Sequence, residues 1–357
     1  MQQRPLRSIL VTGGAGFIGS EFVRQTLRTS DALVVNLDKL TYAGNLGALK
    51  ECAGNSRYHF VQGDITDREL ARSLLQTHEC DSVVNFAAES HVDRSIGQPL
   101  EFTRTNVLGT CELLDASFGY WRALPPDRAD NFRFVQISTD EVYGSLGTEG
   151  SFTETSPCAP NSPYSASKAA ADHFARAYFQ TYGLPTVIAR ASNNYGPFQQ
   201  PEKLIPLMIV NALEGRPLPV YGDGSNVREW LHVCDFCAAV TRILERGEVG
   251  ETYNVGGNCE RSNLEIVQSI CEVVDRSSES GSPATELIEF VADRPGHDFR
   301  YALESSKLRG ELGWQTKIEF EDGLAETIAW YMDRYKNQDP LVSGSLHRQR
   351  LGLERKG

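Results

Sequence analysis

Three glycines at spacings of three residues, Gly13, Gly16 and Gly19, follow an apolar run at 8–11 and open a helical pattern that extends to about residue 27. In a strand–turn–helix unit, such glycines make a tight turn, let the backbone approach a pyrophosphate and allow the helix to pack closely on the strand. The amides and the dipole of the helix N-terminus then face the phosphate charge. The turn therefore predicts a dinucleotide site at one edge of an α/β sheet.

Apolar, β-branched runs alternate with helical patterns through the first two-thirds of the chain. The runs predict strands at 33–37, 58–62, 82–86, 132–137 and 186–189, and the periodic segments predict helices at 67–76, 100–117 and 162–182. Strands that alternate with helices through short connections form βαβ units, whose parallel sheet is covered on both faces. We expect a doubly wound Rossmann sheet.

The pattern changes after Pro197. A length of 357 residues favours about two domains, and turn residues now cluster between short segments without regular alternation. We expect a Rossmann domain at 1–197 that also carries the catalytic residues, with some later segments returning to it, and a smaller mixed α/β domain at 198–339. Loops are expected at 256–257 and 277–283, an amphipathic helix at 320–335, and a peripheral tail at 340–357.

Composition excludes several classes of protein. The 47 acidic residues exceed the 35 Lys and Arg residues, so a net charge of −12 argues against binding nucleic acid polymers or anionic membranes. No apolar run approaches the roughly 20 residues of a membrane span, and no signal peptide is evident. Eight cysteines are too sparse for a disulfide scaffold. We expect a cytoplasmic protein without a metal site. Cys234 and Cys237 are either buried thiols on successive helical turns or a metal or redox pair.

Several residues after the predicted strands are candidates for cofactor contacts. Asp38 lies about 20 positions after the glycines, where a carboxylate binds ribose hydroxyls and repels a 2′-phosphate, which favours NAD over NADP. Asp64 and Ile65 lie where an adenine contact is expected, although Asp64 also suits a loop or a helix cap. The small side chains in Phe86–Ala88 allow close approach of the cofactor, and Asn85 suits either a structural hydrogen bond or a cofactor contact.

Tyr164 and Lys168 begin the helix predicted at 162–182, and a spacing of four residues places them on one helical face. A tyrosine with a pKa of about 10 is a poor base at neutral pH, but a neighbouring ammonium favours the phenolate and lowers that pKa. The pair can therefore take a proton from a hydroxyl while a hydride leaves the same carbon. With the glycine turn, the pair resembles the extended short-chain dehydrogenase/reductase family, with Thr139 in the place of its active-site Ser or Thr.

Asp140 and Glu141 follow the strand predicted at 132–137. Such a pair is often a solvated turn, but ligand sites of α/β sheets lie at this end of the strands. Two neighbouring carboxyls can act as acid and base if their environments separate their pKa values. Hydride transfer alone does not need a second acid and base, whereas the elimination of water needs both.

The segment 137–144 is similar to the Thr-Asp-Glu signature of the nucleoside-diphosphate-glucose 4,6-dehydratases. The resemblance extends from residue 9 to about residue 301, and its further blocks are 87–95, 163–168, 192–197, 201–206 and 293–298. One departure is Asn85, where some members carry His. No motif is evident in the tail.

The resemblance implies a mechanism. Tyr164 takes the 4-hydroxyl proton as C4 of the sugar gives a hydride to NAD, and Lys168 holds the phenolate and the nicotinamide ribose. Glu141 removes the C5 proton, and Asp140 protonates the departing 6-hydroxyl, while Thr139 bonds the 4-oxygen region. NADH then returns the hydride to C6, so the products are a 4-keto-6-deoxy sugar nucleotide and water.

The resemblance also implies binding residues, with the sugar nucleotide held by the 198–339 domain. Its NAD contacts, beyond those above, are Phe17, Ile18, Lys39, Leu40, Thr41, Ser90, Thr105 and Asn194. Its sugar-nucleotide contacts are Ser90, Asn193, Lys203, Leu204, Pro219, Val220, Tyr221, Arg228, Asn263, Asp293, Arg294 and His297. Arg228 and Lys203 can neutralise a diphosphate. Thr105 also suits a helix residue that bonds backbone, and His91 and His297 also suit core or loop positions.

The resemblance favours dTDP-glucose as the substrate and implies a homodimer. The alternatives on the same scaffold are a UDP-glucose 4,6-dehydratase, a 4-epimerase and a decarboxylase. The last two need the Tyr–Lys pair and NAD but not Asp140 and Glu141. A catalytically inert Rossmann binding protein is a further alternative, but such a protein is expected to have lost Tyr164, Lys168 or a glycine of the turn.

Overall fold

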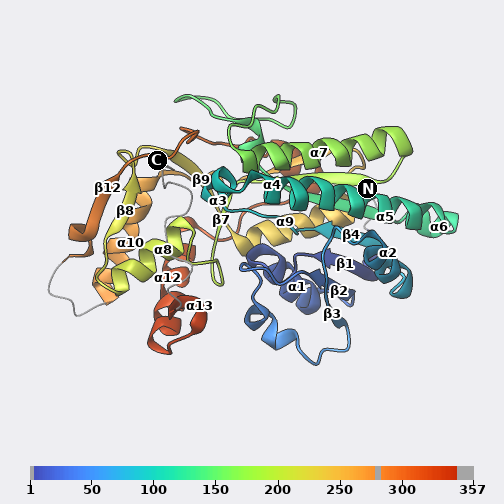
Figure 1. The fold of residues 1–357 in the computed structure, drawn as a ribbon, viewed down its shortest axis with the longest axis horizontal. Coiled ribbons are helices and arrows are strands. Elements are labelled where there is room, and N and C mark those ends of the chain that lie inside the picture. Colours follow the sequence, from blue (N-terminus) through green and yellow to red (C-terminus); the bar gives the residue numbers. More distant parts are fainter. Residues whose placement is uncertain (1–3, 278–282, 344–357) are drawn as a thin grey trace.

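The computed structural model describes residues 4–277 and 283–343. A parallel seven-stranded sheet, in the order β10-β6-β5-β4-β1-β2-β3, forms its centre (Figure 1). The strands are β1 Ser8–Thr12, β2 Leu33–Asp38, β3 Tyr58–Gln62, β4 Ser82–Asn85, β5 Arg133–Thr139, β6 Thr186–Ala191 and β10 Thr252–Val255. The order reverses between β1 and β4, and ligands of such sheets bind at that point. The Rossmann fold predicted from the alternating pattern is confirmed.

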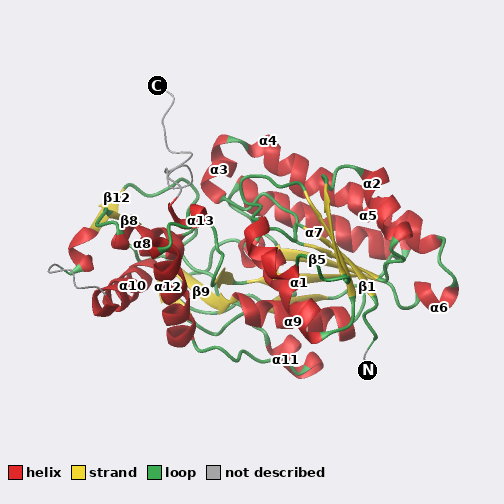
Figure 2. Cartoon of the chain, turned by 90° about the horizontal axis from the view of Figure 1, so that it is seen from below, coloured by secondary structure: helices red, strands yellow, loops and turns green. Residues whose placement is uncertain are grey.

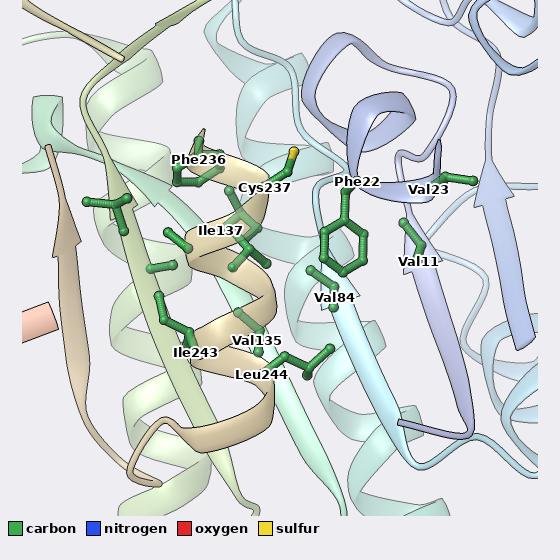
Figure 3. Close-up of a cluster of buried hydrophobic side chains, with 14 of the residues drawn as sticks. Val11, Phe22, Val23, Val84, Val135, Ile137, Phe236, Cys237, Ile243 and Leu244 are labelled. Carbon is green, nitrogen blue, oxygen red and sulfur yellow. The ribbon is translucent and has the colours of Figure 1, made fainter. Parts of the chain in front are cut away.

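Helices cover both faces of the sheet (Figure 2). One face packs against α1 Phe17–Thr29 and α9 Val233–Arg246, and the other against α2 Arg68–Thr77, α5 Thr110–Arg122 and α7 Pro163–Tyr182. Successive side chains of a strand point to opposite faces. In β1, Val11 therefore joins Phe22 and Phe236 in one core cluster (Figure 3), whereas Leu10 joins the cluster on the other face.

The long helix predicted at 100–117 is built from three parts. It comprises α4 Pro99–Phe102, the π-helical segment η2 Thr103–Gly109 and α5, and the shorter α3 Val92–Gly97 precedes it. The π-helical segment contains Thr105, one of the predicted cofactor contacts, and such turns are frequent at functional sites.

A second lobe carries its own core, at the left of Figure 1. It contains a three-stranded sheet, β11-β9-β7, and a parallel pair, β12-β8. Its strands and helices are β7 Asn193–Tyr195, α8 Leu204–Leu213, β8 Leu218–Tyr221, β9 Val227–His232, β11 Glu260–Ser262, α10 Asn263–Ser277, β12 Ile288–Val291 and α12 Phe320–Lys336. In α12, Leu324, Ile328 and Tyr331 are buried, which confirms the predicted amphipathic helix.

Short elements complete the described chain. They are η1 Leu46–Cys52, α6 Pro126–Ala129, η3 Asp140–Tyr143, η4 Ala284–Leu287, α11 Ser306–Leu312 and α13 Pro340–Ser343. No helix in the described ranges is long and apolar enough to cross a membrane.

Both α9 and β10 return to the large sheet after residue 197, and the domain boundary itself stays a prediction. The loop at 256–257 follows β10, as expected. Most of the loop predicted at 277–283 lies outside the described residues, since Ser277 ends α10 and 278–282 are not described. The tail prediction is wrong at its start, because Val342 is fully buried in the core of the second lobe. Residues 344–357 lie outside the described part.

Candidate active site

Two cavities lie at the carboxyl edge of the large sheet. The first, the sheet cavity, is bordered by the ends of β1, β2, β4, β5 and β6 and by the start of α7. The second, the lobe cavity, lies between α3, α8, β8 and β9. The cavities share four wall residues, Glu141, Asn193, Glu202 and Lys203. A molecule can therefore reach from one cavity into the other.

The glycine turn is shaped for close approach of a ligand. Gly13 has a φ of +69°, and a Cβ there would lie 2.6 Å from the Ala87 amide nitrogen. A Cβ on Gly19 would lie 2.2 Å from the Gly13 carbonyl oxygen. Helix α1 begins at Phe17 without a side-chain cap on its first amides. Those amides are the donors that a dinucleotide phosphate needs, so this part of the chain fits NAD.

Two carboxylates follow β2 and β3 in the sheet cavity. Asp38 accepts hydrogen bonds at 2.8 Å from the amides of Ala15 and Leu40, which holds the turn and the strand end together. Although burial would raise the pKa of Asp64, a 2.7 Å ion pair with Lys39 holds it below its ordinary value. Asp64 also accepts a bond from the Thr66 amide, so the turn-capping role and a wall position coincide.

Asn85 makes structural hydrogen bonds, which was one of the two roles expected for it. Its side chain is fully buried and does not line the cavity. It donates to Gln136 Oε1 at 2.9 Å and accepts from Thr12 Oγ1 at 2.6 Å. These bonds join β4 to β5 and β1 beneath the cavity floor.

Asp140 is buried, which overturns the solvated-turn interpretation of the acidic pair. It is 1% exposed and begins η3 directly after β5. Its Oδ1 accepts from Thr139 Oγ1 at 3.2 Å, and its Oδ2 has no hydrogen-bond partner among the described residues. Burial, then the charge of Glu141, holds the pKa of Asp140 well above its ordinary value. This carboxyl is suited to carry a proton.

Glu141 has a different environment. It faces both cavities, and burial raises its pKa, but the charges of Arg294, Arg228 and Lys203 act in the opposite direction. The two acids therefore differ in their neighbours: burial and the charge of Glu141 both raise the pKa of Asp140, whereas three cations oppose the rise at Glu141. Such a difference in environment is what a division into acid and base requires.

Tyr164 and Lys168 are held on the first turns of α7. Ser162 and Ser165 form a capping box, and Pro163 occupies the first turn. Lys168 Nζ donates to the Ile137 carbonyl oxygen at 2.6 Å. Burial lowers the pKa of Lys168 to about 8, against the charge of Asp172, which raises it.

The pKa of the Tyr164 phenol is raised in the protein alone, not lowered as the Tyr–Lys spacing led us to expect. Burial, then the charge of Glu141, raises the pKa of Tyr164 above its ordinary value, although a hydrogen bond with Thr139 lowers it. Three carboxyl groups, Glu141, Asp140 and Asp172, add to this rise. Additional positive charge in the cavity would favour the phenolate.

The lobe cavity holds the cationic residues that the acidic net charge obscured. Lys203 Nζ donates to the Ser90 carbonyl at 2.7 Å, and Arg228 donates to the Asp298 carbonyl at 3.0 Å. Arg294 pairs with Asp93 at 3.1 Å. All three cations lie within a wall that also carries apolar side chains.

Most residues predicted to bind the cofactor line the sheet cavity. They are Gly13, Gly16, Phe17, Ile18, Gly19, Asp38, Lys39, Thr41, Asp64, Ile65, Phe86, Ala87, Ala88, Ser90, Thr105, Tyr164, Lys168 and Asn194. Leu40 is not in the wall, and with a φ of +57° it instead gives its amide to Asp38.

Most residues predicted to bind the sugar nucleotide line the lobe cavity. They are Asn193, Lys203, Leu204, Pro219, Val220, Tyr221, Arg228, Asn263, Arg294 and His297. Ser90 and Thr139 lie in the sheet cavity instead. Asp293 lies in neither wall and lies 2.6 Å from His297 Nδ1, so it orients a wall residue. Burial lowers the pKa of His297 to about 4, which keeps the ring neutral at physiological pH.

Sequence reasoning missed several wall residues. Glu202 lies between the cavities, and Asp93, Met208, Asn211 and Trp230 line the lobe cavity. Two of these residues could have been found from the sequence. Met208 and Asn211 lie four and seven residues after Leu204, and this spacing places them on the same face of α8 as that predicted contact. His91 also lines the lobe cavity and accepts from the Arg94 amide, so it caps α3.

The two cysteines on α9 are free thiols whose surroundings disfavour the reactive thiolate. The Sγ atoms of Cys234 and Cys237 approach Glu21 Oε1 and the Ile18 carbonyl, each at 3.5 Å. Burial, then the charge of Glu21, raises the pKa of Cys234 to about 12 and that of Cys237 well above its usual value. These contacts favour the buried-thiol interpretation. Over 4–277 and 283–343, no group of three His, Cys, Asp or Glu side chains is placed to hold a metal.

Known proteins resemble this chain over nearly its whole length. The family model described as GDP-mannose 4,6 dehydratase matches residues 10–327. The dTDP-glucose 4,6-dehydratase of Xanthomonas campestris pv. campestris (strain B100) is 56% identical over 345 residues, which cover 96% of this chain and 98% of that protein.

Solved structures agree with the sequence relatives. The dTDP-glucose 4,6-dehydratase (rfbB) of Bacillus anthracis str. Ames, in complex with NAD, superposes with a TM-score of 0.84 at 47% identity, covering 94% of this chain and 99% of that one. The dTDP-glucose 4,6-dehydratase DesIV of Streptomyces venezuelae, with NAD and TYD bound, gives a TM-score of 0.86 at 47% identity and the same coverage. Sequence and fold therefore lead to the same group of proteins.

Proposed function

This chain belongs to the family described as GDP-mannose 4,6 dehydratase, and from that premise we propose that it is an NAD-dependent dTDP-glucose 4,6-dehydratase. One observation carries the proposal: the buried Asp140 and the half-buried Glu141 lie in the same cavity as Tyr164 and Lys168. Hydride transfer uses the second pair, and removal of water uses the first. The reaction converts dTDP-glucose to dTDP-4-keto-6-deoxyglucose and water, and the enzyme is a hydro-lyase.

The sheet cavity is the NAD site. The chemistry that bound NAD supplies is a positive charge and the reversible acceptance of a hydride, taken from C4 of the sugar and given back at C6. The glycine turn would hold the phosphates, and Asp38 would orient the adenosine ribose. The raised pKa of Tyr164 means that the phenol remains protonated until the site gains positive charge. The phenol would then release its proton to solvent, and the resulting phenolate, stabilised by the Lys168 ammonium, would take the proton of the 4-hydroxyl at Oη.

The two carboxyl groups act as the base and the acid of the elimination. A 4-ketone acidifies the proton on C5, and Glu141, at which three cations oppose the rise in pKa that burial causes, removes it as the carboxylate. Asp140 holds a proton on its buried carboxyl group and gives it to the 6-hydroxyl, which leaves as water. The C5–H and C6–O bonds break, a C5–C6 double bond forms, and a proton returns to C5 when the hydride returns to C6.

The lobe cavity holds the sugar nucleotide. Arg228, Lys203 and Arg294 supply the local positive charge that a diphosphate needs inside an acidic protein. Pro219–Tyr221 form an apolar wall against which a base can pack. Glu141 and Lys203, which face both cavities, lie where the sugar would reach the cofactor.

A 4-epimerase or a decarboxylase would need the Tyr–Lys pair and NAD but not a buried carboxyl that retains its proton. A UDP-glucose 4,6-dehydratase differs only in the base. Thymine carries one methyl group more than uracil, which a pocket discriminates by about 1–3 kcal/mol. The names of the relatives favour the dTDP sugar.

We also propose that the enzyme is a cytoplasmic homodimer. Leu108 on η2 and Phe174 and Tyr182 on α7 are 49%, 42% and 51% exposed. These apolar side chains lie on packed helices of the large sheet's outer face, as an interface between two copies requires. The eight cysteines are all free thiols, which suits a reducing compartment. Sedimentation equilibrium should give twice the chain mass, and a monomer at micromolar concentration would contradict the dimer.

Turnover of several substrates tests the function. The purified chain with NAD is incubated separately with dTDP-glucose, UDP-glucose and other nucleoside-diphosphate glucoses, and the products are identified by NMR. We expect a 4-keto-6-deoxy sugar from dTDP-glucose at the highest kcat/KM. A product inverted at C4, with no loss of water from any substrate, would refute the dehydratase assignment.

A further inference from the structure

A buried carboxylate, Asp172, has no part in the chemistry described above. It lies on α7 four residues after Lys168, which itself lies four residues after Tyr164. This spacing places the three side chains along one helical face. Asp172 is 0% exposed, and it does not line either cavity. A charge in such a position needs partners, because burial of an isolated carboxylate is very unfavourable.

The partners of Asp172 come from two strands of the sheet. Its Oδ2 accepts from Ser138 Oγ at 2.9 Å and from Arg190 Nε at 2.9 Å. Ser138 directly precedes Thr139 at the end of β5, and Arg190 lies on β6. One oxygen thus joins α7, which carries Tyr164 and Lys168, to the strand end that carries the other catalytic groups. The second oxygen, Oδ1, is buried without a hydrogen-bond partner among the described residues.

We propose that Asp172 is a positioning residue for the Tyr164–Lys168 pair. Its buried negative charge keeps Lys168 protonated, and its bonds to Ser138 and Arg190 hold α7 in register with the end of β5. The proposal rests on the proposed function for the role that it gives to Lys168. Asp172 does not touch substrate or cofactor and acts only through its neighbours.

The surroundings of Lys168 explain why it needs this support. Its ammonium is buried and donates to the neutral carbonyl oxygen of Ile137. The titratable groups around it are Tyr164 and Asp172 on its own helix, Asp140 and Glu141 on η3, and Arg190 on β6. Burial lowers the pKa of Lys168, and Asp172 is the charged group that raises it. Removal of this one charge therefore favours the neutral amine.

Arg190 is the ion-pair partner of Asp172, with Nε 2.9 Å from Oδ2. The pair is buried on both sides, with side chains 7% and 0% exposed. The guanidinium also lies 4.7 Å from the centre of the Tyr143 ring, which fixes its position. Removing one partner of a buried pair leaves the other charge uncompensated. The two single substitutions therefore leave opposite charges beside Lys168, and only the loss of Asp172 should lower its pKa.

NMR titration of Lys168 tests the proposal. The full chain with bound NAD is labelled with ¹⁵N-lysine, and the Nζ signal of Lys168 is assigned by its loss in Lys168→Arg. In Asp172→Asn we expect the pKa of Lys168 to fall by about 1–3. In Arg190→Gln it should stay or rise, and in Ser138→Ala, which keeps both charges, it should stay. An unchanged pKa in Asp172→Asn, or an equal fall in the aspartate and arginine variants, would overturn the proposal.

The double variant Asp172→Asn/Arg190→Gln provides the test if a single variant does not fold, since it leaves no charge unpaired. Its Lys168 pKa should also lie below that of the wild type, and a value equal to the wild type would count against the proposal. The titration needs no substrate, so it stands even if dTDP-glucose is not turned over. With turnover, the alkaline limb of kcat in Asp172→Asn should move to lower pH, and Asp172→Glu should restore it; a uniform loss at all pH values would indicate a structural role alone.

Discussion

Substitution of Asp140 by Asn removes the acidic proton that this carboxyl group can donate and changes the shape of the side chain little. The amide has the shape of the carboxyl, and its oxygen can still accept from Thr139 Oγ1, which lies 3.2 Å from Asp140 Oδ1 in the wild type. Tyr164, Lys168 and the cofactor turn do not touch the lost hydroxyl. The variant should therefore bind NAD and oxidise C4 but fail to protonate the departing 6-hydroxyl.

The size of the defect follows from the role of the acid. General acid catalysis contributes about 10²- to 10⁴-fold, or about 2.7–5.5 kcal/mol of barrier at about 1.36 kcal/mol per tenfold. We expect kcat to fall within this range. Because oxidation continues while elimination stalls, reduced nicotinamide should accumulate and be visible by its near-ultraviolet absorbance in stopped flow.

The same Asp140→Asn substitution that lowers kcat should leave the folded protein as stable as the wild type or more stable. The folded-state pKa of Asp140 is raised above the unfolded value of about 3.9. The native state therefore binds this proton more tightly, so its contribution to stability is complete below about pH 3.9 and is lost as pH rises through the folded pKa. Asn is neutral throughout and avoids that loss, so Tm at neutral pH should equal or exceed the wild-type value.

The matched control is Asp127→Asn, at an exposed position on α6, and it should change neither kcat nor Tm. A turnover in Asp140→Asn within about threefold of the wild type, far below the effect of a lost general acid, would refute its assigned role. So would a variant that forms no reduced nicotinamide, because the defect would then precede elimination.

Four further changes test other parts of the site. Glu141→Gln should also accumulate reduced nicotinamide, but, unlike the Asp140 variant, it should lose exchange of the C5 proton with deuterated solvent; retained exchange would exclude Glu141 as the base. Gly13→Ala, whose Cβ would lie 2.6 Å from the Ala87 amide nitrogen at a φ of +69°, should weaken NAD binding in calorimetry and destabilise the fold by about 1–3 kcal/mol, and wild-type affinity would contradict the close-approach geometry. Because burial lowers the pKa of Lys168 to about 8, the ammonium persists only below that pH, so kcat of the wild type should decline as pH rises through about 8; a rate that stays constant well above it would count against the lysine. Arg228→Gln should raise KM for the sugar nucleotide about 10- to 100-fold with NAD affinity unchanged, and an unaltered KM would remove it from the diphosphate site.

The parallel sheet could be predicted because local pattern and global fold agree there. In β1, Val11 and Leu10 face opposite helix layers, so the middle of the strand, residues 9–11, is apolar at every position. The glycine turn was equally readable, since Gly13 and Gly19 have no room for a side chain. Predictions succeeded wherever a single residue type satisfies the local requirement.

Properties that depend on distant neighbours could not be predicted. The spacing of Tyr164 and Lys168 was informative, but the raised pKa of the phenol depends on Glu141, which arrives from another element. The π-helical segment Thr103–Gly109 has no local signature, and Asp293 is set behind the wall by its contact with His297. Val342 is likewise buried because it packs into the core of the second lobe, and this contact between distant parts of the chain has no local pattern in the sequence.

Transfer of a hydride within one sugar tests the central claim most directly. The enzyme is supplied with dTDP-glucose that carries deuterium at C4, and the product is analysed by NMR and mass spectrometry. The account predicts a 4-keto-6-deoxy product with the deuterium at C6, because the hydride removed at C4 is the one returned after water leaves. Deuterium that remains at C4 in a product with inverted configuration, or that is lost to solvent, would contradict it.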